Sequence, residues 1–511
     1  MNKKKLILRN MFLAAFVLLG TLVGSAYDFT VNGIYYNING AEVTVVSGDG
    51  YTGDIVIPSS VTFNGTTYSV TAIGESAFNG QIYVSSVKIP GSVKTIGNYG
   101  FYGCTAMTTA NLSEGLTTIG HRAFESCTSL TEVTIPNSVT NMADGYYYYS
   151  NYYGYATNTE GIFSHCTALT TLTIGNGLTR LPSMCCYDCP ALVNLNIGSA
   201  VTTIGSRAFQ YCIGLIDVTI PDGVTTIEDC VFEGCYGIET IHLGTGLTII
   251  GGWAFNGCYG LKNVVIPENV TTINSNAFRG CTGMENLTIG ASVSTLGDEA
   301  FRGCTGLTRV TIPRTVTSLG GSIFRDCTGL TSINFQNAII GSYMFCNCTG
   351  LVDLVLADNV TQIRDNAFRD CVSMESLTLS SGLLSMNNDV FYNCNALTTV
   401  TSRSDIAPTM SNQNGFTCYN NATLYVPIGA TEDYELTDWW YLFSSIVEKN
   451  MDDTIIPGDV DGDGIVNITD VTELIDRLLN GTAGMSGDVD GDGIVNITDI
   501  TELIDLLLNG N

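Results

Sequence analysis

Two short stretches near the C-terminal end of the chain carry aspartates at a spacing suited to metal binding. They run GDVDGDGIVNITD from Gly458 and again from Gly487. Counted from the first aspartate, carboxylates stand at positions 1, 3, 5 and 12, and glycine stands at position 6. This spacing wraps hard oxygen donors around one Ca²⁺, with a backbone carbonyl from position 7 and usually a water at position 9. We therefore expect two Ca²⁺ ions at these positions: Asp459, Asp461, Asp463, Ile465, Asn467 and Asp470 in the first loop, and Asp488, Asp490, Asp492, Ile494, Asn496 and Asp499 in the second.

Each loop is followed by an apolar pattern of helical period, which in the first copy is Val471, Leu474, Ile475 and Leu478. A small all-α module over residues 458–511 is therefore expected. The alternative, a solvated acidic tail, does not account for a ligand spacing that occurs twice.

The duplicated loop–helix unit resembles a type I dockerin domain, in which Asp instead of the EF-hand Glu stands at position 12. The resemblance implies attachment to a cohesin-like partner through positions 10 and 11. Those positions are Ile468, Thr469, Ile497 and Thr498. The family often has basic residues at positions 17 and 18, where this chain has Ile475-Asp476 and Ile504-Asp505. The near-identity of the copies predicts that either one can face the partner, in two orientations related by a half turn.

A repeat occupies the middle of the chain. Thirteen cysteines from Cys104 to Cys394 are spaced mostly 23 residues apart, and Phe stands three positions before each, except where Cys186 replaces it. One further turn at Phe78 brings the array to about fourteen rungs, a rung being one repeat. A fixed short period of this kind predicts a solenoid, in which each repeat buries its apolar face against its neighbours.

Each rung contains a short strand followed by a turn. In one rung, Leu261, Val264 and Ile266 are expected to point inward, and alternation exposes Asn263 and Val265. The pattern L-x-x-V-x-I-P, then V-x-x-I, then A-F-x-x-C, resembles the BspA-type leucine-rich repeat family over residues 67–402. The resemblance implies a solenoid with parallel β-structure on one face and loops or short turns on the other, an N-terminal cap at 27–66 and a C-terminal cap at 403–448. A linker at 449–457 would join it to the module.

One rung carries an insertion, because Cys127 and Cys166 are 39 residues apart. It covers about residues 144–161 and is expected to emerge as a surface loop. Seven tyrosines crowd into it: Tyr146, Tyr147, Tyr148, Tyr149, Tyr152, Tyr153 and Tyr155. Tyrosines supply large contact area and hydroxyls at low entropic cost, so this is the candidate ligand loop. The alternative is a loop that only folds back over neighbouring rungs.

The in-register cysteines are expected to form a reduced, buried row, since free cysteine behaves as a small hydrophobe. Five cysteines are out of register, among them Cys185, Cys186 and Cys230, and their redox state stays open. A zinc site at Cys185–Cys189 is disfavoured, because no His or second Cys pair lies nearby in the sequence.

The first 26 residues combine a basic start, a short apolar run and a small-residue end, which is typical of a secretory signal peptide. Its cleavage would remove four basic residues and move the net charge from -28 to about -32. So acidic a chain is a poor partner for nucleic acid or anionic lipid. No other stretch is long and apolar enough to span a membrane.

No catalytic constellation is found, because His121, His165 and His242 have no consistent acidic or nucleophilic neighbour in the sequence. The sequence thus favours a secreted or cell-surface bacterial protein without enzymatic activity. Its solenoid would bind host, matrix or glycan ligands, as the family's association with adhesion implies. The alternative is a non-catalytic subunit of a polysaccharide-degrading assembly; an undetected hydrolase is the weakest hypothesis.

Overall fold

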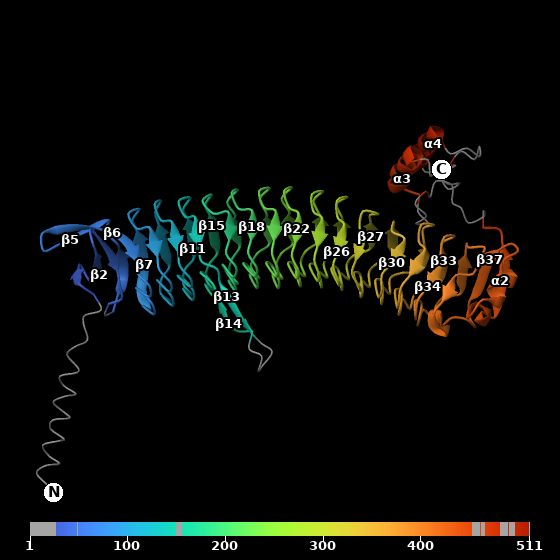
Figure 1. Ribbon diagram of the computed structural model, residues 1–511, viewed down its shortest axis with the longest axis horizontal. Helices are drawn as coiled ribbons and strands as arrows, with labels where there is room; N and C mark the ends of the chain where they lie inside the picture. Colours follow the sequence, from blue (N-terminus) through green and yellow to red (C-terminus); the bar gives the residue numbers. More distant parts are fainter. Residues whose placement is uncertain are drawn as a thin grey trace, which may run out of the picture. The chain divides into compact units, whose positions relative to one another are not determined.

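The structure is a computed structural model that describes residues 27–48, 50–149, 156–451, 460, 466–480, 489 and 496–509. Backbone alone is described for 147–149, 156–159, 476, 477, 479, 480, 505 and 509. The chain divides into two compact units, Met1–Gly214 and Leu215–Asn511. Each is a parallel β-solenoid in its repeat region, as the period predicts, with the strands of successive rungs side by side (Figure 1).

Unit 1 begins with five strands, whose bounds are β1 Phe29–Val31, β2 Ile34–Asn39, β3 Glu42–Val45, β5 Ser60–Phe63 and β6 Thr66–Ile73. They pair antiparallel, except that β3 pairs with β6 in parallel. Phe29 of β1 and Phe63 of β5 stack with their ring centroids 4.3 Å apart. The pair links the first and fourth of these strands through their side chains.

Two parallel rows of strands follow in unit 1. The longer row pairs in the order β17-β15-β11-β9-β7-β4, with bounds β4 Thr52–Val56, β7 Tyr83–Ile89, β9 Thr109–Leu112, β11 Glu132–Ile135, β15 Thr171–Ile174 and β17 Asn194–Asn196. The shorter row has two-residue strands: β8 Thr95–Ile96, β10 Thr118–Ile119, β12 Asn141–Met142, β16 Arg180–Leu181 and β18 Thr203–Ile204.

Unit 2 repeats the two rows. The longer strands are β19 Asp217–Thr219, β21 Thr240–His242, β23 Asn263–Val265, β25 Asn286–Thr288, β27 Arg309–Ile312, β29 Ser332–Phe335, β31 Asp353–Val355, β33 Ser376–Leu379, β35 Thr399–Ser402, β37 Thr423–Pro427 and β38 Ser445–Lys449. The shorter ones are β20 Thr226–Ile227, β22 Ile249–Ile250, β24 Thr272–Ile273, β26 Thr295–Leu296, β28 Ser318–Leu319, β30 Ile339–Ile340, β32 Gln362–Ile363, β34 Ser385–Met386 and β36 Thr409–Met410.

The alternation of burial follows the sequence pattern. In β23, Val264 is buried between exposed Asn263 and Val265, as predicted. Neighbouring rungs pair in register 23 residues apart, so Asn263 lies opposite Asn286. A one-residue slip would turn the apolar set to the solvent, which is why the register is fixed.

The core contains a ring ladder and a sulfur ladder. Phe278 and Phe301 of successive rungs stack at 5.4 Å with planes 4° apart, and the other core phenylalanines repeat the arrangement. All eighteen cysteines are free and buried. The sequence did not show that the thiols also donate hydrogen bonds: Cys281 Sγ reaches the carbonyl oxygen of Phe255 at 3.3 Å, and the pattern recurs along both units. Each of these in-register thiols thereby donates to a carbonyl at the turn of the preceding rung.

The C-terminal end of the repeats in unit 2 is closed by bulky aromatic residues. The elements are η1 Gln413–Gly415, α2 Thr431–Leu436 and η2 Trp440–Leu442. Tyr434 and Trp440 are fully buried. The Tyr434 hydroxyl donates to Ser402 Oγ at 2.7 Å, and Trp440 Nε1 donates to the Pro408 carbonyl at 2.7 Å. Large buried rings with satisfied polar tips replace the missing next rung.

The last elements are α3 Ile468–Asn480 and α4 Ile497–Asn509. They share a small apolar core formed by Val460, Val471, Leu474 and Leu503. Within the part of the chain that the structure describes, no helix is both long and apolar enough to cross a membrane.

Candidate binding sites

Both helices of the C-terminal module begin with reciprocal side-chain caps. Asn467 Oδ1 accepts the backbone N–H and the hydroxyl of Thr469, both at 2.8 Å. In return, Asp470 Oδ2 accepts the backbone N–H of Asn467 at 2.7 Å, which completes a capping box. Asn496, Thr498 and Asp499 repeat these bonds in the second copy.

The second carboxylate oxygen of each cap reaches into the preceding loop. Asp470 Oδ1 accepts the backbone N–H of Val460 at 2.7 Å, and Asp499 Oδ1 accepts that of Val489 at 2.8 Å. Both aspartates are fully buried. A buried carboxylate is costly unless it is paired or coordinates a cation, so an anionic oxygen held here fits a hard cation such as Ca²⁺.

The remaining predicted ligands lie outside the described residues: Asp459, Asp461, Asp463, Ile465, Asp488, Asp490, Asp492 and Ile494. Among the residues that are described, no three His, Cys, Asp or Glu side chains group to hold a metal. The residues that would hold Ca²⁺ are therefore the buried Asp470 and Asp499 together with the loop positions before them.

Helices α3 and α4 expose apolar side chains outside the shared core. Ile468 is 67% exposed and Ile497 is 76% exposed, at the first helical position of each copy. Ile475, Ile504 and Leu508 continue these exposed stripes. The adjacent Thr469 and Thr498 hydroxyls donate inward to their caps. The face is thus mainly apolar, with the threonine hydroxyl protons directed to the helix ends.

The tyrosine-rich insertion in unit 1 is a β-hairpin. Strands β13 Tyr146–Tyr149 and β14 Ala156–Glu160 pair antiparallel, with an irregularity between Tyr148 and Tyr149. Tyr146 is 57% exposed. Of the other tyrosines, Tyr147, Tyr148 and Tyr149 lie on β13, and Tyr152, Tyr153 and Tyr155 lie outside the described residues. The expected surface loop is therefore a hairpin that projects from the rungs where it is described (Figure 1).

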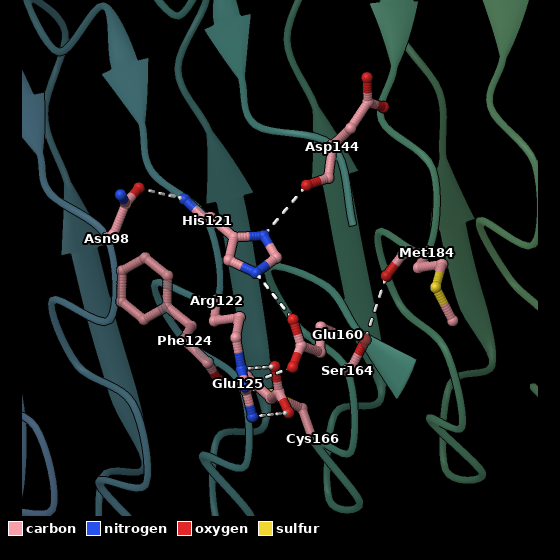
Figure 2. Close-up of polar contacts among 10 residues, drawn as sticks. All are labelled: Asn98, His121, Arg122, Phe124, Glu125, Asp144, Glu160, Ser164, Cys166 and Met184. Atoms are coloured by element: carbon pink, nitrogen blue, oxygen red, sulfur yellow. Dashed lines mark hydrogen bonds and ion pairs between the residues drawn. The ribbon is translucent and has the colours of Figure 1, made fainter. Parts of the chain in front are cut away.

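The root of this hairpin is fixed by an ionic cluster (Figure 2). His121 Nδ1 contacts the Asp144 carbonyl oxygen at 3.0 Å, and His121 Nε2 contacts Glu160 Oε2 at 3.2 Å. Arg122 Nη1 donates to Glu160 Oε1 at 2.9 Å. Its Nε and Nη2 hold both oxygens of Glu125, at 2.7 and 2.9 Å. Two residues of one rung thus hold the last residue of β14.

Burial sets the electrostatics of this cluster. Glu125 is only 3% exposed, and burial raises the pKa of its carboxyl, an effect that Arg122 only partly opposes. Burial also acts on Asp144, but the Ser183 N–H and the Arg180 guanidinium outweigh it and lower the pKa of that carboxyl. The bidentate Arg122–Glu125 pair is therefore a buried ion pair whose partners depend on each other.

The histidines have acidic neighbours in space that the sequence did not show. His121 contacts Glu160, His165 contacts Asp188 at 3.1 Å, and His242 lies 3.6 Å from Asp217. Asp188 and Asp217 come from neighbouring rungs and Glu160 comes from the hairpin, 23 to 39 residues from the histidines, so local sequence does not reveal these contacts. Two of the pairs join neighbouring rungs and the third holds the hairpin, which are structural roles.

The sequence also left the large acidic excess unexplained. In unit 2, Asp222 Oδ1 accepts the backbone N–H of Thr245 at 2.8 Å, and Asp229 Oδ1 accepts that of Gly252 at 2.7 Å. Both acceptors lie 23 residues before the donor, so each caps an N–H of the next rung. The bond from Thr245 lowers the pKa of Asp222. Many acidic residues thus serve as inter-rung caps.

The parallel rungs with their ring and sulfur ladders define a leucine-rich-repeat solenoid protein, whose chain continues into a module with the two helices α3 and α4. The chain belongs to the BspA type leucine rich repeat family, whose model matches residues 58–157, 156–262, 227–349 and 338–432. A dockerin type I domain matches residues 457–508. No curated protein matches the chain.

Solved bacterial leucine-rich repeat proteins are similar to the chain. One from Bacteroides ovatus is 24% identical with a TM-score of 0.60, covering 83% of this chain and 100% of its own. A leucine rich cell surface protein from Faecalibacterium prausnitzii is 25% identical with a TM-score of 0.43, covering 74% of this chain and 95% of its own. The first likeness shows the leucine-rich repeat fold. Both families that the chain contains are non-catalytic, and dockerins bind cohesins.

Proposed function

We propose that this chain is a secreted, non-enzymatic binding protein that is attached to a cohesin-like partner by its C-terminal module. Two Ca²⁺ ions would hold the module, and the solenoid would present a protein- or glycan-binding surface. The observation that carries the docking part is the pair of matching helix starts. In both copies a buried capping aspartate sits beside an exposed isoleucine and a threonine.

The matching helix starts predict a specific mutational pattern. Ile468→Asp alone is expected to weaken binding to a cohesin panel by about twofold, because the second copy still offers its own face. Ile468→Asp combined with Ile497→Asp should cost about 2 kcal/mol or more, roughly thirtyfold, as exposed apolar anchors are lost from both. The assay is surface plasmon resonance of the full chain in calcium.

The control is built into the substitution. Aspartate in the first turn of a helix is favourable, so the double variant should keep its calcium and its helices. Full-strength binding by a double variant that retains both would contradict the docking face. A single variant as weak as the double one would contradict the equivalence of the copies.

We propose that the ligand binds at the tyrosine hairpin and not at the exposed strand face. That face is small and polar: Asn286 Nδ2 donates to Asn263 Oδ1 at 2.7 Å, and Asn194 Nδ2 donates to Thr171 Oγ1 at 3.2 Å. Its side chains satisfy one another between rungs, whereas tight interfaces are anchored by Tyr, Trp and Arg. Tyr146 and a root held by Arg122 and His121 supply a positioned aromatic arm.

Replacement of residues 147–159 by a short Gly-Ser link tests this placement. The link keeps Tyr146 and Glu160, so the root contacts survive and the Tm should change by less than about 2 °C. Binding to a glycan array, or to a panel of immobilised matrix proteins, should be lost. Retained binding together with a large drop in Tm would instead support the alternative that the hairpin only covers neighbouring rungs.

The same two panels separate the general hypotheses. Hairpin-dependent binding to matrix proteins supports an adhesion protein. Hairpin-dependent binding to plant glycans supports a non-catalytic subunit of a polysaccharide-degrading assembly. The proposed secretion rests on the signal-peptide pattern of residues 1–26, which lie outside the described residues.

A further inference from the structure

One rung of unit 1 departs from the core pattern of the others. In the next rung Ala208 and Phe209 precede Cys212 by four and three positions, and both are fully buried. Here Cys185 and Cys186 take those places before Cys189. The ring ladder, which runs through Phe124 and Phe163 at 5.3 Å, meets a thiol at this rung. All three cysteines are fully buried, and Cys186 stands where the other rungs have a phenyl ring.

Cys186 and Cys189 stand at the two ends of one tight turn. Residues 183–188 are in turn conformation. The corresponding turns of the two neighbouring rungs are closed by backbone hydrogen bonds. The Cys166 N–H donates to the Phe163 carbonyl at 3.2 Å, and the Cys212 N–H donates to the Phe209 carbonyl at 3.1 Å. The Cα atoms at the ends of such a turn are less than about 7 Å apart, which overlaps the span of a disulfide.

The two thiols differ in their surroundings. Cys189 Sγ donates to the Phe163 carbonyl at 3.1 Å, and Cys212 Sγ donates to the Cys186 carbonyl at 3.1 Å. Burial raises the pKa of the Cys186 thiol. Burial also acts on Cys189, but the neighbouring thiols outweigh it and lower the pKa of Cys189 below the usual value. Of the two, Cys189 therefore loses its proton more readily.

We propose that Cys186 and Cys189 form a reversible disulfide within this turn. Two S–H bonds break and one S–S bond forms, and the two electrons and two protons pass to a protein disulfide, which is reduced to two thiols. Because both thiols are fully buried in the folded rung, the exchange takes place while the rung is open: the Cys189 thiolate attacks the oxidant, and Cys186 resolves the mixed disulfide. Cysteines of successive rungs point in parallel, which disfavours a dihedral near 90°, so the rest of the ladder stays reduced.

This turn lies on the rung that supports the tyrosine hairpin. Gly145 N–H donates to the Ser183 carbonyl at 2.9 Å, and Ser164 Oγ donates to the Met184 carbonyl at 3.1 Å. Asp144 accepts the Ser183 N–H at 2.8 Å. Ser183 and Met184, which make these contacts, directly precede the turn. A disulfide between Cys186 and Cys189 would therefore stiffen the chain next to the residues that support the hairpin.

The test is a thiol map of the full chain, expressed into an oxidising periplasm and purified without reductant. The protein is alkylated under denaturing conditions and digested. The peptide that contains Cys185, Cys186 and Cys189 should then carry one alkyl group, on Cys185. Its fragment ions should show a disulfide between Cys186 and Cys189. Reduction before alkylation should restore three, and the other fifteen cysteines should be alkylated in both samples. Three alkyl groups without reduction, or a bond to Cys185 or Cys212, would overturn the proposal.

Two substitutions that restore the residues of the other rungs serve as matched variants. Cys186→Phe should fold, since Phe occupies this place elsewhere, and should leave both Cys185 and Cys189 alkylated. Cys185→Ala should keep the disulfide. Oxidation that persists between Cys185 and Cys189 in Cys186→Phe would show that the pairing is wrong.

Discussion

Removal of calcium from the full chain is expected to raise amide hydrogen exchange throughout α3 and α4 and to leave the solenoid strands unchanged. Between Pro457 and Asn511 there are twelve acidic residues and one basic residue, so the net charge is near -11 in about 55 residues. Among the described residues of this module, the buried core is small and holds four residues. Without a cation the self-repulsion has little to offset it, so calcium binding becomes folding free energy.

The expected effect is large. With free Ca²⁺ at about a thousand times the dissociation constant, binding stabilises the folded module by about 4 kcal/mol, which corresponds to about a thousandfold slower exchange. Hydrogen exchange measured by mass spectrometry on peptides 466–480 and 496–509 reports both helices. β23 of the same chain serves as the internal reference.

Two double variants distinguish the role of the metal from that of the cap. Asp459→Ala with Asp488→Ala removes predicted ligands only, and should abolish the calcium effect. Asp470→Asn with Asp499→Asn keeps a side-chain oxygen for each capping box but removes one negative charge from each metal site. This variant should show a smaller effect of calcium on amide exchange. Helices equally protected in EDTA would contradict calcium-coupled folding.

Loss of the Arg122 guanidinium is expected to be the most damaging change at the hairpin root. Arg122→Met at neutral pH should lower the free energy of unfolding of this region by about 3–5 kcal/mol, because it leaves the buried Glu125 carboxylate without its partner. The measurement is hydrogen exchange of β10 and β11 across a urea series, since repeat arrays need not unfold in two states.

The control is the double variant Arg122→Met with Glu125→Met, which should recover most of the loss, because two apolar side chains replace the buried pair. The loss should also depend on pH. Burial raises the pKa of Glu125, so the folded state takes up a proton more readily than the unfolded state. The cost of Arg122→Met should therefore be largest at neutral pH and shrink toward about pH 5. An equal cost in the double variant would show that packing, and not charge, holds the root.

The repeat architecture was predictable because it depends only on the spacing of residue types along the chain. A 23-residue period and alternation such as that around Val264 determine the rungs and their inward faces. The family resemblance added the type of repeat, and the family models match the same regions. The stacking of phenylalanines on phenylalanines and of cysteines on cysteines follows from the register of the rungs.

What the sequence did not show are contacts across rungs that have no periodic signal. Glu160 comes from the insertion, so its pairing with His121 and Arg122 depends on where the hairpin emerges. The thiol donors were treated as simple apolar groups, because the carbonyls that receive them belong to the preceding rung. The capping boxes could have been found: Asn467 and Asp470 have the three-residue spacing of such a cap, but the calcium pattern accounted for both residues first.

Docking through either copy of the module requires calcium in both loops, so the most direct test is the number of Ca²⁺ ions that the full chain holds. Native mass spectrometry in calcium should show two ions on the full chain, one on Asp459→Ala and on Asp488→Ala, and none on the double variant. A full chain that holds no calcium, or a double variant that still holds two ions, would contradict the account.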